Sequence, residues 1–184
     1  MVHFRNGDTL ALPPDHIFEA ITETLLLNVY CFDQLTKGRV VVDIGASIGD
    51  FAVLATQTRG VHLYAYEPTL GAFTYLQSNL KLNRRDHVWL FNHAADARTL
   101  GSIISEYQET CIDFLKIDCE GCEYSLLLGC PEEILAKVKR IAMEIHEIWN
   151  HNTEEIFTRL RIAGFRIQQV QTFGHGHYVH ATRT

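Results

Sequence analysis

Residues 40–50 read Val40-Val41-Val42-Asp43-Ile44-Gly45-Ala46-Ser47-Ile48-Gly49-Asp50. A continuous β-branched run is typical of a strand that is covered on both faces, and the glycines after it indicate a tight turn into a helix. The next apolar run, residues 61–66, is followed by the acid Glu67. The spacing from Asp43 to Glu67 fits one strand–helix–strand unit of about 20–30 residues. Glycine lets the backbone approach a ligand, and a carboxylate accepts hydrogen bonds from ribose hydroxyls, so this unit predicts a site for a small ligand with a ribose.

Apolar runs and helical patterns alternate along the rest of the chain. We expect strands at 39–44, 61–66, 88–92, 112–117, 140–145, 166–171 and 177–181. We expect helices at 16–27, 48–58, 70–82, 100–108 and 121–128, a short one from Pro131, and one from 153 to 164. Such alternation predicts a parallel sheet between two helical layers. The fold class is therefore α/β: a Rossmann-like seven-stranded, mostly parallel sheet with helices on both faces and an antiparallel edge strand.

The size and charge of the chain narrow its class. A length of 184 residues, 47% of them apolar, suits one compact domain. Residues 1–38 predict a hairpin that turns at Asn6-Gly7 and a helix, both packed on the core, and residues 39–184 predict the Rossmann-like domain. A net charge of −6 without a basic block argues against a nucleic-acid partner. No signal-peptide pattern is visible and no apolar run reaches the roughly 18–20 residues of a bilayer span, so we expect a cytoplasmic protein with no membrane partner. The oligomeric state is left open.

The chain has five cysteines, and an odd number in a chain of this kind favours free thiols. Cys119 and Cys122 form a Cys-x-x-Cys motif, but the second pair that a zinc ribbon needs is missing. The neighbouring acids Asp118, Glu120 and Glu123 raise thiol pKa values and disfavour a redox role. We therefore expect Cys119 and Cys122 to be buried or half-buried thiols.

Polar and small residues follow the first five predicted strands. Ligands of open parallel sheets lie beyond the carboxyl ends of the strands, so these residues form the predicted site. They are Asp43, Gly45, Ala46, Ser47 and Gly49 after the first strand; Glu67 and Pro68 after the second; Ala94 and Ala95 after the third; Asp118 and Glu120 after the fourth; and Glu144 and His146 at the fifth. Tyr30, ahead of the first strand, is a candidate to cover the ligand.

A nicotinamide dinucleotide is one candidate ligand. Its fingerprint is Gly-x-Gly-x-x-Gly, but counted from Gly45 the second and third glycines fall at Ser47 and Asp50. Asp50 would also repel a pyrophosphate at the start of the helix. The pattern suits better a ligand without phosphate, whose cationic and carboxylate ends meet Asp43 and the loop amides. S-adenosylmethionine is such a ligand, and an NAD(P)-dependent oxidoreductase is the weaker alternative.

Four motifs carry a family resemblance. Residues 42–51 resemble motif I of class I S-adenosylmethionine-dependent methyltransferases, and Tyr66-Glu67-Pro68 resembles their ribose-binding acidic motif. Residues 113–123, Asp-Phe-Leu-Lys-Ile-Asp-Cys-Glu-Gly-Cys-Glu, resemble the Lys-Ile-Asp-x-Glu-Gly-x-Glu signature of the FkbM family, and residues 142–146 resemble its strand-five motif. The resemblance spans about residues 15–182. It implies a seven-stranded Rossmann-like fold and transfer of a methyl group from S-adenosylmethionine, commonly to a hydroxyl oxygen.

Roles follow for the predicted site residues. The cofactor is expected to contact Asp43, Gly45, Ala46, Ser47, Gly49, Glu67, Pro68, Ala94, Ala95 and Tyr30. Catalysis is assigned to Asp118, Glu120 and His146, because a placed carboxylate or imidazole can remove a hydroxyl proton. Lys116 shares a strand face with Asp118 and is expected to pair with an acid there. A divalent ion on Asp118, Glu120, Glu144 and His146 is an alternative that the sequence does not favour, so no metal is assigned.

The predicted function is thus O-methylation, dependent on S-adenosylmethionine, of a hydroxyl on a small-molecule or glycan-like acceptor. The short chain leaves a second hypothesis, a non-catalytic module of the same fold that binds the cofactor or another protein.

Overall fold

The computed structural model describes residues 1–13, 22, 24, 27–30, 39–173 and 176–183. Within these residues a seven-stranded sheet has the order β5-β4-β3-β6-β7-β9-β8. Its parallel strands are β3 (Val40–Ile44), β4 (His62–Tyr66), β5 (Val88–Phe91), β6 (Phe114–Ile117) and β7 (Arg140–His146). Strand β9 (Gly176–Arg183) runs antiparallel to both β7 and β8 (Phe165–Phe173). The predicted fold class is confirmed, with one refinement: the reversed strand lies between β7 and β8, so β8 forms the edge.

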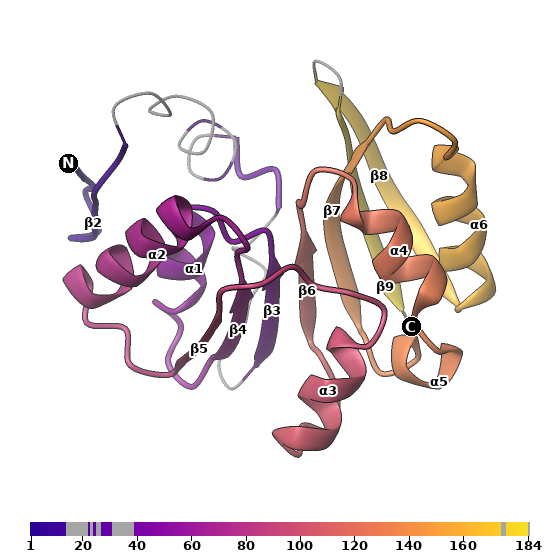
Figure 1. The fold of residues 1–184 in the computed structure, drawn as a ribbon, viewed down its shortest axis with the longest axis horizontal. Coiled ribbons are helices and arrows are strands. Elements are labelled where there is room, and N and C mark those ends of the chain that lie inside the picture. The colour runs from indigo at the N-terminus through magenta and orange to yellow at the C-terminus, as the bar shows by residue number, and fades with distance from the viewer. Residues whose placement is uncertain (14–21, 23, 25–26, 31–38, 174–175, 184) are drawn as a thin grey trace.

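Two helical layers cover this sheet, one on each face. Successive strand residues point to opposite faces, so the apolar residues of β3 are divided between the two layers. Val40, Val42 and Ile44 join a cluster with α3 (Thr99–Glu106), α4 (Cys122–Gly129), α5 (Glu132–Leu135) and α6 (Thr153–Ile162). Val41 joins the other cluster, with α1 (Asp50–Ala55) and α2 (Leu70–Leu82). Figure 1 shows α1 and α2 beside β3 to β5, and α4 and α6 beside β7 to β8. None of the helices described has the length and apolar character of a bilayer span.

Most predicted element bounds agree with the structure to within a few residues. Helix α2 has the predicted bounds 70–82. Helix α1 is shorter than the predicted 48–58, because Gly49 is its N-cap, with φ of 86°, and Thr56 is its C-cap. The predicted helix at 16–27 falls mainly on residues outside those described.

The N-terminal hairpin, β1 (Val2–His3) and β2 (Thr9–Leu10), is tied to the end of α2. The Thr9 amide donates to Asn83 Oδ1 at 2.8 Å, and the Ala11 amide donates to Asn79 Oδ1 at 2.7 Å. These asparagines therefore replace the strand partner that the hairpin lacks on this side. The division at residue 38 remains a prediction.

Candidate functional site

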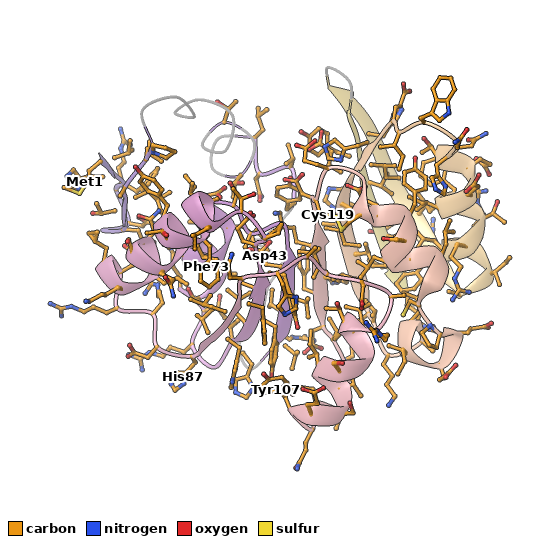
Figure 2. All side chains as sticks on the ribbon, viewed as in Figure 1. Met1, Asp43, Phe73, His87, Tyr107 and Cys119 are labelled. Carbon is orange, nitrogen blue, oxygen red and sulfur yellow. A yellow bond between two sulfur atoms is a disulfide. The ribbon has the colours of Figure 1, made fainter. Side chains whose placement is uncertain are left out.

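The predicted site lies at the carboxyl edge of the sheet. Figure 2 shows Asp43 near the middle of the molecule and Cys119 above it, whereas His87 and Tyr107 lie along the lower edge. His87 precedes β5 and Tyr107 follows α3, so the lower edge is the amino edge of the strands.

The loop after β3 contacts the ends of both neighbouring strands. The amides of Gly45 and Ala46 both donate to Tyr66 O, at the end of β4, at 3.0 Å. Gly45 has a φ of 75°, and a Cβ atom at this position would lie 1.6 Å from Asp118 O. Only glycine permits that approach, so Gly45 brings the loop against the residue that follows β6.

Gly49 has a packing role of the same kind. A Cβ atom there would lie 2.6 Å from Leu76 Cδ1 of α2, and its φ of 86° is in the left-handed region. Helix α2 therefore packs directly on the start of α1, and no side chain caps that start. Both predicted approach glycines thus meet protein on the side where a Cβ would project.

Glu67 closes the loop from the β4 side. Its side chain is buried, with 6% of the residue exposed. Oε2 accepts from the Ser47 amide at 2.9 Å and Oε1 from the Thr69 amide at 2.7 Å. Each carboxylate oxygen has two lone pairs, so each retains one for a hydroxyl donor. The predicted juxtaposition of loop and acid is confirmed, and the ribose contact stays a prediction.

Asp43 and Lys116 form a buried ion pair beneath the loop. They are partners in the β3–β6 register, and Lys116 Nζ lies 3.1 Å from Asp43 Oδ1. The same ammonium donates to Gly45 O at 2.7 Å and lies 3.7 Å from Asp118 Oδ2. The predicted ion pair of Lys116 is confirmed, and through it Asp43 fixes the loop.

Each member of this pair affects the pKa of the other. Burial raises the pKa of Asp43 to about 6, against the opposing effect of Lys116. Burial by itself lowers the pKa of Lys116, but the nearby carboxylates, Asp43 first, raise it overall. Lys116 therefore stays a cation. Asp43 Oδ2 has no hydrogen-bond partner among the residues described.

Tyr30 is a core residue that holds Asp118. Its hydroxyl donates to Asp118 Oδ2 at 2.8 Å, and its ring makes edge contacts with Phe51 and Tyr178. Burial, followed by the Asp118 charge, raises the pKa of Tyr30, so the phenol remains a donor. Whether Tyr30 covers a cofactor is not tested by these contacts, and that role stays a prediction.

The three predicted catalytic residues come together at the ends of β6 and β7. One ligand atom from each of Asp118, Glu120 and His146 lies within 4.8 Å of the other two. His146 Nε2 is 3.5 Å from Glu120 Oε2 and 3.8 Å from Glu144 Oε1. A carboxylate-rich site with one imidazole can accept a proton or hold a cation.

Glu123, which was not among the predicted site residues, positions the imidazole. It is fully buried in α4, and its Oε1 lies 2.8 Å from His146 Nδ1. The bond to Glu123 is the main cause that raises the pKa of His146 to about 9. The available signal was an acid beside the apolar residues Tyr124, Leu126 and Leu127, since a buried charge needs a partner.

The expectation of free thiols at Cys119 and Cys122 is wrong, because the two form a disulfide. Between them Glu120 and Gly121 have positive φ values of 55° and 107°. This tight turn brings the two Cα atoms to 5.5 Å, within disulfide range. The disulfide follows from the backbone turn. The effect of neighbouring acids on thiol pKa values does not predict that turn. Cys111 and Cys130 are free, and Cys31 is outside the residues described.

The remaining predicted cofactor contacts follow β3, β4 and β5. Pro68 and Ala94 are exposed, Ala46 is buried, and Ala95 packs in the cluster with α3. Asn92 Nδ2 donates to Glu67 O at 2.9 Å and so joins the ends of the two strands. The room for an adenine ring beside Ala94 stays a prediction.

Part of the chain is similar to known methyltransferases. Residues 92–167 match the model of the methyltransferase FkbM domain. Over this segment the chain is similar to FkbM methyltransferases. Probable methyltransferase-like protein 24 of Rattus norvegicus is 30% identical over 100 residues, which are 49% of this chain and 28% of that protein. AMB antimetabolite synthetase AmbE of Pseudomonas aeruginosa is 40% identical over 55 residues, which are 30% of this chain and 3% of that protein. The chain therefore spans less than a third of either curated relative.

Solved structures show the same fold. Precorrin-6y C5,15-methyltransferase from Geobacter metallireducens GS-15 superposes with a TM-score of 0.65 at 14% identity, over 95% of this chain and 94% of that one. Fibrillarin of Aeropyrum pernix, with natively bound S-adenosyl-L-methionine, has a TM-score of 0.57 at 15% identity, over 85% and 74%. At these identities the likeness shows the Rossmann-like fold alone.

Proposed function

We propose that this chain binds S-adenosylmethionine and methylates a hydroxyl of a small-molecule or glycan-like acceptor. One observation carries the proposal: the loop after β3 contacts Glu67 through the Ser47 amide and Asp118 through Gly45. Glu67, the proposed ribose ligand, and the cluster of Asp118, Glu120 and His146 therefore lie on either side of one loop. The FkbM domain supports methyl transfer, and the ligand of the fibrillarin structure supports the cofactor.

The residues present fit the cofactor. Glu67 holds its carboxylate in place with two backbone amides and still offers lone pairs to the ribose hydroxyls. When bound, S-adenosylmethionine supplies an electrophilic methyl group. Asp43 and Lys116 act beneath the ligand by fixing the loop.

The cluster at the ends of β6 and β7 receives the acceptor. Methyl transfer is an in-line attack, so most of the rate comes from holding the hydroxyl in position. Asp118 is itself positioned by the hydrogen bond from the Tyr30 hydroxyl and by the nearby ammonium of Lys116. Removal of the hydroxyl proton by a placed group adds roughly 10²–10⁴-fold. Asp118, Glu120 and His146 are the groups that border this step.

Calorimetry with S-adenosylhomocysteine tests the cofactor. We expect a dissociation constant below about 1 mM, that is, binding stronger than about −4 kcal/mol. Glu67→Gln should weaken binding at least about tenfold, because an amide cannot accept from both ribose hydroxyls and both loop amides. The matched control is Glu109→Gln, since Glu109 is another carboxylate that accepts a hydrogen bond, from the Tyr64 hydroxyl at 2.8 Å, but it follows α3. No heat of binding by the wild-type chain would refute the proposal.

A turnover assay separates the enzyme from the non-catalytic module. Consumption of the methyl donor is followed across a panel of hydroxylated acceptors. Asp118→Asn should abolish consumption and leave S-adenosylhomocysteine binding intact. Binding without turnover on any acceptor would favour the module.

A further inference from the structure

Four carboxylates surround one imidazole beyond the ends of β6 and β7, and one of them is Glu144, whose Oε1 lies 3.8 Å from His146 Nε2. Glu123 binds His146 Nδ1, and Glu120 lies 3.5 Å from His146 Nε2. Asp118 completes the group, with ligand atoms of the three residues within 4.8 Å of one another. Lys116, the nearest buried cation of the described residues, is closer to Asp43 than to Asp118. Four carboxylates therefore face one lysine, which Asp43 shares, and one imidazole, so the cluster has an excess of negative charge.

The orientation of His146 is the second, independent observation. Its Nδ1 is bound by Glu123, a fully buried residue outside the three ligands, so its Nε2 faces Glu120. A histidine that binds a metal almost always donates its other ring N–H to a carboxylate in this way. Glu123 Oε2 has no hydrogen-bond partner among the residues described. The partners of this carboxylate, His146 Nδ1 and the Cys119 amide, both contact its Oε1.

The surrounding chain fixes Asp118 and the backbone turn at Glu120, and it leaves the Glu120 side chain exposed. Asp118 is anchored by Tyr30, and the Cys119–Cys122 disulfide closes the turn that carries Glu120. The Glu120 side chain is 87% exposed, which leaves one side open to water or to an acceptor oxygen. Two carboxylates and one imidazole suit a first-row divalent cation that accepts both oxygen and nitrogen.

We propose that Asp118, Glu120 and His146 bind a divalent cation of the Mn²⁺ type, with Glu123 as the residue that positions the imidazole. Metal binding stands by itself, and its role rests on the proposed function. A cation there would bind the acceptor hydroxyl and acidify it. The hydroxyl proton then passes to water, the oxygen pair forms the new carbon–oxygen bond, and the carbon–sulfur pair returns to sulfur.

The test is an electron paramagnetic resonance titration of Mn²⁺ into the full chain after treatment with a chelator. The wild-type chain should bind one Mn²⁺. Glu123→Gln should weaken binding about 10–100-fold, as expected for loss of an outer partner. Glu120→Gln, at an exposed position that the fold tolerates, should weaken it at least about tenfold. The control is Glu155→Gln, because Glu155 also accepts from a histidine Nδ1, that of His151 at 3.1 Å, on the exposed face of α6.

The outcomes separate this proposal from the preceding one. Absence of bound Mn²⁺, or equal binding by wild type and Glu120→Gln, overturns the metal site. Calorimetry with S-adenosylhomocysteine on the same sample then reports the cofactor site independently. If turnover requires His146 although no cation binds and chelator has no effect, the imidazole acts as the base and the metal proposal fails.

Discussion

Lys116 is the buried cation on which the loop after β3 depends. It contacts Asp43 and Gly45 O, and it lies near Asp118. Removal of one partner from a buried ion pair is strongly destabilising, because the other charge stays in the interior without compensation. The first residue of the stretch that resembles the FkbM signature therefore stabilises the loop after β3.

Lys116→Met should lower the free energy of unfolding by about 3–5 kcal/mol, measured by urea denaturation. The double variant Asp43→Asn/Lys116→Met should recover much of that loss, because no buried charge is left over. Lys139→Met is the control, since Lys139 pairs with Asp113 at 2.7 Å from a half-exposed position, where ion pairs contribute about 0.2–1 kcal/mol. Equal losses at positions 116 and 139 would contradict this role.

His180 makes stability depend on pH. Its Nε2 donates to Val29 O at 2.6 Å, and burial lowers its pKa below the usual 6.5. The unfolded chain binds this proton more readily than the folded chain, so the contribution is complete above about pH 6.5 and is lost as the pH falls. His180→Gln keeps a donor without the titration. Its free energy of unfolding should fall less than that of wild type between about pH 7.5 and pH 5, and an identical fall would exclude the effect.

The helices show which element bounds a sequence can predict. The helical spacing of Leu76 and Leu80 predicts helix α2 at its observed bounds. In the structure both side chains are buried. Helix α1 was predicted too long, because a glycine that can continue a helix pattern here caps the helix with a positive φ. Close approach to α2 decides that conformation, and such tertiary contacts are not local in sequence.

Gly45→Ala should disrupt the edge between β3 and β6. The new methyl group would overlap Asp118 O, and the positive φ adds strain, so we expect a loss of more than about 3 kcal/mol. Gly101→Ala is the matched control in α3, where a Cβ would meet Ile134 at 3.8 Å, and it should gain about 0.5–1 kcal/mol. Thermal unfolding of both variants is the measurement. An unchanged midpoint for Gly45→Ala would show that the loop does not press on β6.

The topology of the whole sheet made most of the site predictable, whereas the rest depends on a local backbone turn. Parallel strands place their carboxyl ends at one edge, so Glu67, Asp118 and His146 had to share that edge once the strand order was assumed. The Glu123–His146 bond and the Cys119–Cys122 disulfide depend instead on how α4 begins, after two residues of positive φ. A pattern of apolar spacing contains no information on that turn.

The most direct test is a crystal structure of the full chain with S-adenosylhomocysteine. We predict that the ribose hydroxyls donate to Glu67, beside the Ser47 amide, and that the sulfur faces the cluster of Asp118, Glu120 and His146. A ligand bound elsewhere on the molecule, or bound at this edge without contact to Glu67, would contradict the assignment.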